Sequence, residues 1–441
     1  MPQDPTPETN DAEPATLGSP LRLRCGAVLP NRIAKPAMTE GLADADDRAN
    51  VRHERIYRRW SEGGAGLLIT GNVMVDRRYL ERPGNVVIDD NGGEDGLKAW
   101  AAAGTAGGSH LWMQISHPGR QCTRTSNSEP LSPSDVQLEL AGLFGKPRPM
   151  TEADIADAIR RYARVAAVAR ETGFTGVQVH GAHGYLISQF LSPVTNLRTD
   201  EWGGPLENRA RFLLETVAAT RAAVGDDFPV AVKLNSADFQ KGGFTLEECV
   251  KVAGWLAAAG IDLLEISGGT YEQPQMFEHQ GMEETAAAPQ RESTRRREAY
   301  FLEYARAIQA HAQVPLMVTG GFRSRAVMAD AVATGETAVV GVARPLCVVP
   351  DLPRQLIEGT VEAAEAYERG LRFGPGRLLG PTSPVKLFKL FNVQGEAAWF
   401  YRQILKLADG KEPDASLSLR RALFAHYGTE LAVARRRRFK A

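Results

Sequence analysis

The sequence contains few cysteines for its length, and none has the spacing that metal or cluster ligands usually have. The chain has 441 residues and 4 cysteines, which are far apart: Cys25, Cys122, Cys249 and Cys347. It has no CxxC pair and no close His-Cys spacing, the patterns used by zinc and iron–sulfur sites. A disulfide framework is not expected in a chain with enough apolar residues for a large core. We therefore expect a cytoplasmic protein with reduced thiols and no metal site.

An excess of charge of either sign is also missing. The chain has 52 lysine and arginine residues against 53 aspartate and glutamate residues, a formal net charge of −1. This balance argues against a general nucleic-acid binder and against a protein that binds membrane surfaces through charge. No apolar stretch approaches the roughly 20 residues that span a bilayer. We therefore expect neither a nucleic-acid partner nor a membrane segment.

The N-terminal residues lack the basic start and the apolar segment of a secretory signal. The first 20 residues are instead rich in proline, glutamate, aspartate and threonine. Such a composition cannot bury enough apolar surface to fold. We expect residues 1–17 to form a disordered lead.

Apolar runs of strand length alternate with longer amphipathic segments from Ile33 to about Leu346. Near-continuous Val, Ile and Leu is typical of strands buried on both faces of a parallel sheet. Two of the amphipathic segments begin with capping boxes, at Thr151-Glu-Ala-Asp154 and Thr245-Leu-Glu-Glu248. The predicted strands are Ile33–Met38, Gly66–Gly71, His110–Ser116, Gly176–His180, Pro229–Asn235, Ile261–Ser267, Pro315–Gly320 and Ala338–Ala343.

Strands of this kind joined by crossover helices predict an α/β fold, a (β/α)8 barrel over residues 18–358. A doubly wound sheet is the alternative, although the sequence lacks the GxGxxG turn that would support it. The segment Leu21–Leu29 predicts a hairpin that closes the barrel floor. Residues 359–441 are predicted to be a helical extension, packed on the barrel or on a neighbouring subunit. Its basic run, Arg435–Arg438, is interpreted as a solvated chain end.

The last two predicted strands end in a pattern that suits an anion. Strand seven continues into Gly320-Gly321-Phe322, Ser324 can cap the next helix, and Arg344 follows strand eight. These two strand ends form the usual phosphate position of the fold. A Gly-Gly turn alone can be purely structural. With Arg344 on the neighbouring strand, phosphate binding is the better interpretation.

Two polar residues lie within predicted strands. Gln114, in the third strand, is by default a core amide with satisfied hydrogen bonds. Lys233 ends the apolar run that begins at Val230. An unpaired buried ammonium is costly, so Lys233 requires either an ion-pair partner or an anionic ligand. The sequence leaves both alternatives open.

The fourth predicted strand ends in His180-Gly-Ala-His183-Gly-Tyr185. Two neutral hydrogen-bond donors and one weak acid can hold an oxygen atom and deliver a proton. A metal-dependent barrel hydrolase that uses His180 and His183 is the alternative. It lacks an acidic residue at an obvious companion strand end, with the exception of Glu265.

The same segment is part of a longer pattern. It continues as Leu-Ile-Ser-Gln-Phe-Leu-Ser-Pro193 and is followed by Asn196-Leu-Arg-Thr-Asp200 and Glu207-Asn-Arg209. Asn31-Arg-Ile-Ala-Lys-Pro-Ala-Met-Thr39, Gln114-Ile-Ser-His-Pro-Gly-Arg120 and the two phosphate loops accompany it. Together these motifs closely resemble the Old Yellow Enzyme family, the FMN-dependent NAD(P)H:flavin oxidoreductases and ene-reductases, over roughly residues 18–355.

The resemblance implies FMN as cofactor, with NADH or NADPH as electron donor. It places the Thr39 hydroxyl near the flavin carbonyl beside N5, and Gln114 at the pyrimidine edge. Lys233 takes the position of a cation beside N1 that is usually arginine, which keeps the charge but loses the planar fork. Asn72 stands where the family usually has a small residue. The implied cofactor-binding residues are Ala37, Met38, Thr39, Asn72, Gln114, Lys233, Gly321, Phe322, Ala343 and Arg344.

The resemblance also implies a reaction. His180 and His183 are similar to the pair that holds and polarises a substrate carbonyl, and Tyr185 is similar to the proton donor. Hydride would pass from flavin N5 to the β-carbon of an α,β-unsaturated carbonyl compound while Tyr185 protonates the α-carbon. A phenol with a pKa of about 10 keeps its proton until an enolate-like carbon draws on it. A flavin-binding module without activity is a further alternative.

The chain departs from relatives that reduce 2,4-dienoyl-CoA. Those relatives carry a cysteine-rich cluster site and a second nucleotide-binding portion, neither of which is expected here, so electrons would reach FMN directly. Residues 269–297, rich in Gln, Glu and Arg, are predicted to be a substrate lid. The substrate, the nicotinamide preference and the formation of a homo-oligomer are left open.

Overall fold

A closed ring of parallel strands forms the centre of the protein. The computed structural model describes residues 14–139, 142–267 and 302–439. Neighbouring barrel strands pair in the order β10-β11-β12-β13-β14-β3-β4-β7, and a pairing of β7 with β10 closes the ring. The strands are β3 (Ile33–Lys35), β4 (Leu67–Ile69), β7 (His110–Ser116), β10 (Gly176–Gly181), β11 (Val230–Asn235), β12 (Leu263–Ser267), β13 (Leu316–Thr319) and β14 (Val339–Gly341).

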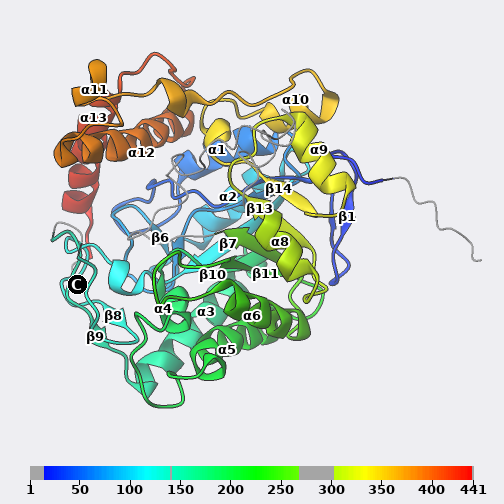
Figure 1. Cartoon of the computed structure of the whole chain (residues 1–441), viewed down its shortest axis with the longest axis vertical. Coiled ribbons are helices and arrows are strands. Elements are labelled where there is room, and N and C mark those ends of the chain that lie inside the picture. Colours follow the sequence, from blue (N-terminus) through cyan, green and yellow to red (C-terminus); the bar gives the residue numbers. More distant parts are fainter. Residues whose placement is uncertain (1–13, 140–141, 268–301, 440–441) are drawn as a thin grey trace, which may run out of the picture.

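Each barrel strand overlaps a predicted one, so the (β/α)8 prediction is confirmed. Helices surround the ring (Figure 1). Those of the barrel are α1 (Val51–Ser61), α2 (Glu94–Thr105), α3 (Glu152–Glu171), α5 (Leu206–Val224), α6 (Leu246–Ala258), α8 (Leu302–Gln309), α9 (Arg325–Ala333) and α10 (Leu352–Glu358). Both predicted capping boxes are present, at the starts of α3 and α6.

Several short strands and turns lie outside the ring of eight strands. Strand β5 (Val73–Met74) pairs with β7, and β6 (Val86–Val87) pairs with β5. Strand β8 (Leu131–Ser132) pairs with β9 (Arg148–Pro149). Helix α4 follows β10, and single 3-10 turns η1 and η2 follow β7 and β14. Their bounds are α4 (Leu186–Leu191), η1 (Gly119–Gln121) and η2 (Arg344–Cys347).

The predicted hairpin closes the barrel floor. Its strands are β1 (Leu21–Arg22) and β2 (Val28–Leu29), which pair antiparallel. Leu23 and Leu29 are buried in the same cluster as the inward-facing side chains of the barrel strands. The Cys25 backbone N–H donates to a carboxylate oxygen of Asp262, the residue before β12, at 2.8 Å. The hairpin therefore lies at the strand starts, opposite the end where barrel active sites form.

The C-terminal extension packs on the barrel. It contains η3 (Tyr367–Gly370), α11 (Gly376–Leu379), α12 (Lys386–Ala408) and α13 (Leu419–Arg436). Helices α12 and α13 lie side by side, and α12 also contacts α1 and η2 (Figure 1). Within the described ranges, no helix combines the length and apolar character that crossing a bilayer requires. Most of the predicted disordered lead, residues 1–13, lies outside the described residues.

The prediction of a solvated basic end is wrong for Arg437, whereas Arg435, Arg436 and Arg438 are exposed. The Arg437 guanidinium is 7% exposed and forms an ion pair with Asp47 at 2.9 Å. Arg438 forms an ion pair with Asp46 at 2.6 Å. The two carboxylates lie in the loop after β3, almost 400 positions away in the chain. The basic run could not indicate the ion pair of Arg437, because its acidic partner lies far away in the sequence.

Candidate active site

Side chains along the barrel strands alternate between the helix layer and the barrel interior. On β10, Val177 and Val179 belong to the core beneath the helices, so Gln178 and His180 face the interior. Lys233 of β11 faces inward by the same alternation and lies in register with His180. Barrel active sites form at the C-terminal strand ends. His180 and Lys233 therefore lie at the catalytic end of the interior.

A chain of buried polar groups crosses the interior. The Gln114 amide donates to the Gln178 side-chain oxygen at 2.7 Å, and the Gln178 amide donates to Glu265 at 2.8 Å. The other carboxylate oxygen of Glu265 lies 2.8 Å from Lys233 Nζ, with the side chains 5% (Lys233) and 0% (Glu265) exposed. The partner of Lys233 is therefore Glu265. An ion pair, one of the two alternatives left open by the sequence, stabilises the buried ammonium.

Two histidines and a tyrosine cluster at the end of β10. The ring centroids of His180 and His183 are 5.2 Å apart, and those of His180 and Tyr185 are 4.7 Å apart. Burial, assisted by the positive charge of Lys233, lowers the pKa of His180 and of His183 well below the usual range. Both imidazoles are consequently neutral at neutral pH. The Ala182 N–H donates to His180 Nδ1 at 3.3 Å, so the proton of the His180 ring is on Nε2.

The backbone turn after β10 fixes His183. Its φ is 61°, in the left-handed region, and its N–H donates to the Asn235 side-chain oxygen at 3.0 Å. His183 Nε2 lies 2.8 Å from the Ser267 hydroxyl. Tyr185 is 4% exposed and occupies the N-cap position of α4. Asn235 and Ser267 end β11 and β12, so these residues come from neighbouring strand ends.

The residues predicted at the flavin edge lie in loops beyond β3 and β4. The Thr39 hydroxyl donates to Glu81 at 3.0 Å, and the Asn72 amide donates to the same carboxylate oxygen at 2.7 Å. Ala37 packs against the inner barrel cluster, and Met38 packs against the core beneath the helices. Glu81 thus joins the two strand ends, and no sequence signal pointed to it.

The predicted phosphate loops are neighbours in space. Strand β13 pairs with β14, with Thr319 opposite Gly341. Gly320 and Gly321 follow with φ values of 130° and 80°, which other residues rarely adopt. Phe322 is 1% exposed. On the β14 side, Ala343 precedes the turn η2, which begins at Arg344.

Ser324 stands at the N-cap position of α9, but its side chain does not cap the helix, so the capping prediction is wrong. The segment after α10 satisfies the backbone there instead. The Arg325 N–H donates to the Glu362 carbonyl at 2.8 Å, and the Ala364 N–H donates to the Arg323 carbonyl at 2.8 Å. Arg323 was not among the predicted site residues. Its position directly after Phe322, which is predicted at the phosphate, is the sequence feature that could have indicated it.

Three observations fit FMN at this end of the barrel. Among the described residues, the buried Asn72 side-chain oxygen and the buried Thr319 hydroxyl have no hydrogen-bond partner. A buried polar atom of this kind usually contacts a ligand or water. The left-handed Gly320-Gly321 turn allows close backbone approach to a phosphate. Asn72 lies beside the predicted ring site and Thr319 beside the predicted phosphate site.

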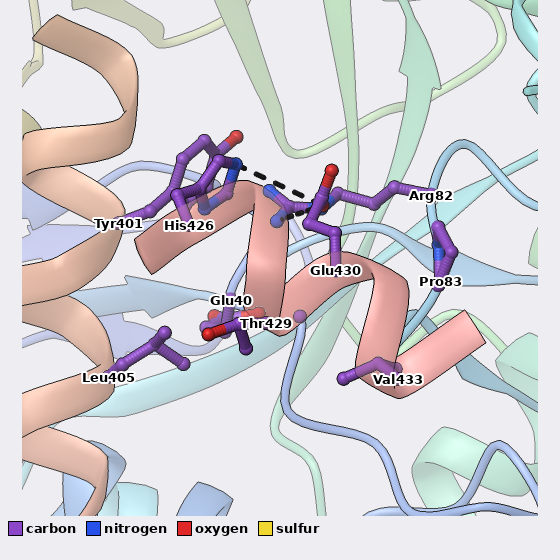
Figure 2. Close-up of a pocket in the computed structure, with 10 residues that line it drawn as sticks. Glu40, Arg82, Pro83, Tyr401, Leu405, His426, Thr429, Glu430 and Val433 are labelled. Atoms are coloured by element: carbon purple, nitrogen blue, oxygen red, sulfur yellow. Dashed lines mark ion pairs between the residues drawn. The ribbon is translucent and has the colours of Figure 1, made fainter. Parts of the chain in front are cut away.

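A separate small cavity lies where the extension meets the barrel. It is lined by Arg82, Tyr401, His426 and Glu430, among others, and its volume is about 10 Å³. Figure 2 shows the Arg82 guanidinium and the His426 ring directed toward Glu430 of α13. That volume suits about one water molecule, not a substrate. The cavity therefore belongs to the packing of the extension.

Comparisons with known proteins agree with the geometry. Residues 16–362 match the NADH:flavin oxidoreductase / NADH oxidase family. The chain is 38% identical over 360 residues to the NADH-dependent flavin oxidoreductase iliE of Hypocrea jecorina (strain QM6a), which covers 77% of this chain and 88% of that protein. It is 35% identical over 418 residues to the NADH-dependent flavin oxidoreductase iccE of Talaromyces variabilis, with 89% and 98% covered.

Other relatives are longer, and two solved structures share the fold. The NADH oxidase of Thermoanaerobacter brockii is 34% identical over 336 residues, which cover 75% of this chain but 49% of that protein. A 2-naphthoyl-CoA reductase complex matches with a TM-score of 0.71 and 29% identity over 79% of this chain and 53% of that one. Morphinone reductase matches with a TM-score of 0.64 and 23% identity, over 80% and 92%.

The motifs, the barrel and the family match agree. The flavin interpretation therefore replaces the hydrolase alternative. The chain belongs to the NADH:flavin oxidoreductase / NADH oxidase family, that of the Old Yellow Enzymes, and it is an FMN-dependent oxidoreductase with NADH or NADPH as electron donor.

Proposed function

We propose that this oxidoreductase reduces the C=C bond of α,β-unsaturated carbonyl compounds and that Tyr185 is the proton donor. The observation that carries the proposal is the cluster of two neutral histidines with a buried tyrosine at the end of β10. Its ring centroids are 5.2 Å and 4.7 Å apart. One oxygen atom can be held there while a proton is delivered nearby.

The histidines suit a carbonyl oxygen. His180 presents its Nε2–H as a neutral donor because its Nδ1 already accepts from the Ala182 backbone. His183 is fixed by contacts to Asn235 and Ser267. Fixed donors stabilise the negative charge that develops on the oxygen during reduction without having to reorient. Their lowered pKa keeps the imidazoles neutral, so they hold the oxygen without adding charge.

Tyr185 suits the proton transfer. Its ring packs against the ring of His180, the residue that is proposed to hold the carbonyl. A phenol with an ordinary pKa of about 10 keeps its proton at neutral pH and releases it to a carbon that acquires carbanion character. The position of Tyr185 at the start of α4 fixes its backbone.

FMN, when bound, supplies the hydride to the substrate β-carbon. We assign its ring to Ala37, Met38, Thr39, Asn72, Gln114 and Lys233, and its phosphate to Gly321, Phe322, Ala343 and Arg344. Lys233 contributes a positive charge held in place by Glu265 at 2.8 Å. A fixed cation beside the ring favours negative charge there.

The experiment is Tyr185→Phe, which removes the acidic hydroxyl while keeping the ring. We expect the rate of enone reduction to fall on the order of 10²- to 10⁴-fold, the usual contribution of a general acid. The rate at which NADH or NADPH reduces the bound flavin should change by less than about twofold, because that step needs no phenol. Stopped-flow absorbance separates the two rates.

The matched control is Tyr162→Phe. Tyr162 is a buried tyrosine of α3, outside the ring cluster at the end of β10. We expect both rates to match those of the wild type. An equal loss of both rates in Tyr185→Phe would overturn the proton-donor assignment. A wild-type protein that accepts electrons from nicotinamide but reduces no enone would overturn the proposed reaction.

A further inference from the structure

Arg344, assigned to the phosphate, and Arg323, which follows the assigned Phe322, both have carboxylate partners in the C-terminal extension. Arg323 Nη2 donates to Glu368 of η3 at 2.7 Å, and Arg344 Nη1 donates to Glu396 of α12 at 2.9 Å. Glu368 also lies 3.8 Å from Arg344 Nη2, so it is shared between both arginines. Both glutamates lie beyond residue 362, where the family match ends.

The extension is attached to the same two loops through its backbone as well. Residues 362–364 run beside the loop after β13, through the Arg325 N–H to the Glu362 carbonyl and a bridge between Ser324 and Ala363. Helix α12 contacts η2, the turn that begins at Arg344. Backbone pairing, helix packing and ion pairs therefore connect the extension to the phosphate loops independently of one another.

Burial holds the Arg323–Glu368 ion pair together. The Glu368 side chain is 5% exposed and the Arg323 side chain 13%. A carboxylate held so far from water must keep its cationic partners close, because an uncompensated buried charge is costly. A guanidinium carries five N–H donors in a planar fork, so it can bind a carboxylate on one side and a phosphate on another.

We propose that Glu368 and Glu396 are positioning residues that hold Arg323 and Arg344 in the orientation that binds the FMN phosphate. The proposal rests on the phosphate assignment of Arg344 made under the proposed function. It adds Arg323 to that site, because Arg323 follows Phe322 and shares Glu368 with Arg344. Arginine side chains lose rotamer freedom when they are fixed, which opposes binding. The glutamates fix them before the cofactor arrives, so less of that cost falls on binding. The extension thereby becomes part of the cofactor site.

The test compares FMN with riboflavin, which has the same ring but no phosphate. Full-length protein is freed of flavin and titrated with each compound, with flavin fluorescence as the readout. We expect Glu396→Gln and Glu368→Gln each to weaken FMN binding about tenfold, the effect of losing one charge-assisted hydrogen bond. Riboflavin affinity should change by less than about twofold, because riboflavin lacks the group that the arginines bind.

The matched control is Asp409→Asn. Asp409 is the C-cap of α12 and forms an ion pair with Arg52 of α1 at 2.8 Å, another link between extension and barrel. We expect its FMN and riboflavin affinities to match those of the wild type. Glu396 is partly exposed, so Glu396→Gln carries the test if Glu368→Gln does not fold.

Three results would overturn the positioning role: unchanged FMN affinity, tighter FMN binding, or an equal loss for both flavins. Tighter binding would mean that the carboxylates compete with the phosphate. Arg344→Ala tests the underlying assignment separately and should weaken FMN binding far more than riboflavin binding. If Arg344→Ala is selective for FMN and the glutamate variants have no effect, only the positioning role fails. If Arg344→Ala is not selective either, the phosphate assignment fails as well.

Discussion

At the scale of single residues, the mouth of the barrel is built from neutral and paired groups. His180 and His183 are neutral because burial disfavours their charged forms, and Lys233 is paired with Glu265. A neutral imidazole that donates from Nε2 suits a partner oxygen with excess negative charge. Phenolate-forming ligands present such an oxygen, so they report on the histidine directly.

We predict that His180→Ala weakens the binding of phenolic ligands on the order of 10- to 100-fold, which corresponds to one hydrogen bond to a charged group. Ligand-induced changes in flavin absorbance measure the affinity. His311→Ala is the control, because His311 is exposed just beyond α8, a barrel helix. Unchanged phenol affinity in His180→Ala would contradict the proposed contact with the substrate oxygen.

At the scale of elements, local signals predicted where α3 and α6 begin but not where each strand stops pairing. The capping boxes of α3 and α6 are present as predicted, because their hydrogen bonds join residues three apart. The first barrel strand ends at Lys35 and not at Met38. Pro36 follows and has no N–H to donate to a neighbouring strand. Met38 and Thr39 therefore lie on a loop, where a ligand can reach them.

Helix α1 offers a test of pH dependence. His53, at the third position of α1, is 1% exposed and accepts a hydrogen bond from the Asn50 backbone in a capping box. Burial, assisted by the charge of Arg52, lowers the pKa of His53 to about 3. Its unfolded pKa is about 6.5, so below that pH the unfolded chain binds a proton that the folded chain does not. The contribution of His53 to stability is thus full above about pH 6.5 and is lost as the pH falls toward 3.

We predict that His53→Gln loses less stability than the wild type on acidification. Glutamine keeps the capping-box acceptor and does not titrate. Between pH 7.5 and pH 5 the difference should be about 2 kcal/mol in the free energy of unfolding. Urea unfolding of both proteins at the two pH values measures it. Parallel losses in the two proteins would show that His53 does not contribute to the pH dependence.

At the scale of the whole molecule, the C-terminal extension joins parts of the barrel that are far apart in sequence. It contacts Arg323 and Arg344 through Glu368 and Glu396, and Arg82 through Glu430. Arg82 follows Glu81, the carboxylate that holds Thr39 and Asn72. Arg437 then ties the chain end to Asp47. The extension is therefore integral to the folded molecule.

We predict that Arg437→Ala lowers the free energy of unfolding by about 3–5 kcal/mol, because Asp47 is then left buried without its cationic partner. Arg436→Ala is the matched control. Arg436 is the neighbouring, exposed arginine, and its loss should change stability by less than about 0.5 kcal/mol. Urea unfolding midpoints compare the two. Equal midpoints for Arg437→Ala and Arg436→Ala would mean that the ion pair of Arg437 with Asp47 does not stabilise the fold.

The predicted lid, residues 269–297, lies outside the described residues, so it stays a prediction. The roles of the individual site residues likewise stay predictions, although the structure brings many of them to one end of the barrel. The predicted site residues are also contacted by charged residues that are not part of the prediction: Glu81, Glu265, Arg323, Glu368 and Glu396. The sequence reasoning passed over most of them because an isolated charged residue has no local pattern.

The sequence by itself determined the barrel, its hairpin floor, the starts of α3 and α6 and its family, because these depend on apolar periodicity and on motifs contained within short segments. The tertiary structure alone decided the partners of Lys233, Arg344 and Arg437. An ion pair depends on distance in space, and each of these joins residues from different elements. Burial, which makes such pairs obligatory and shifts the histidine pKa values, exists only once the chain has folded.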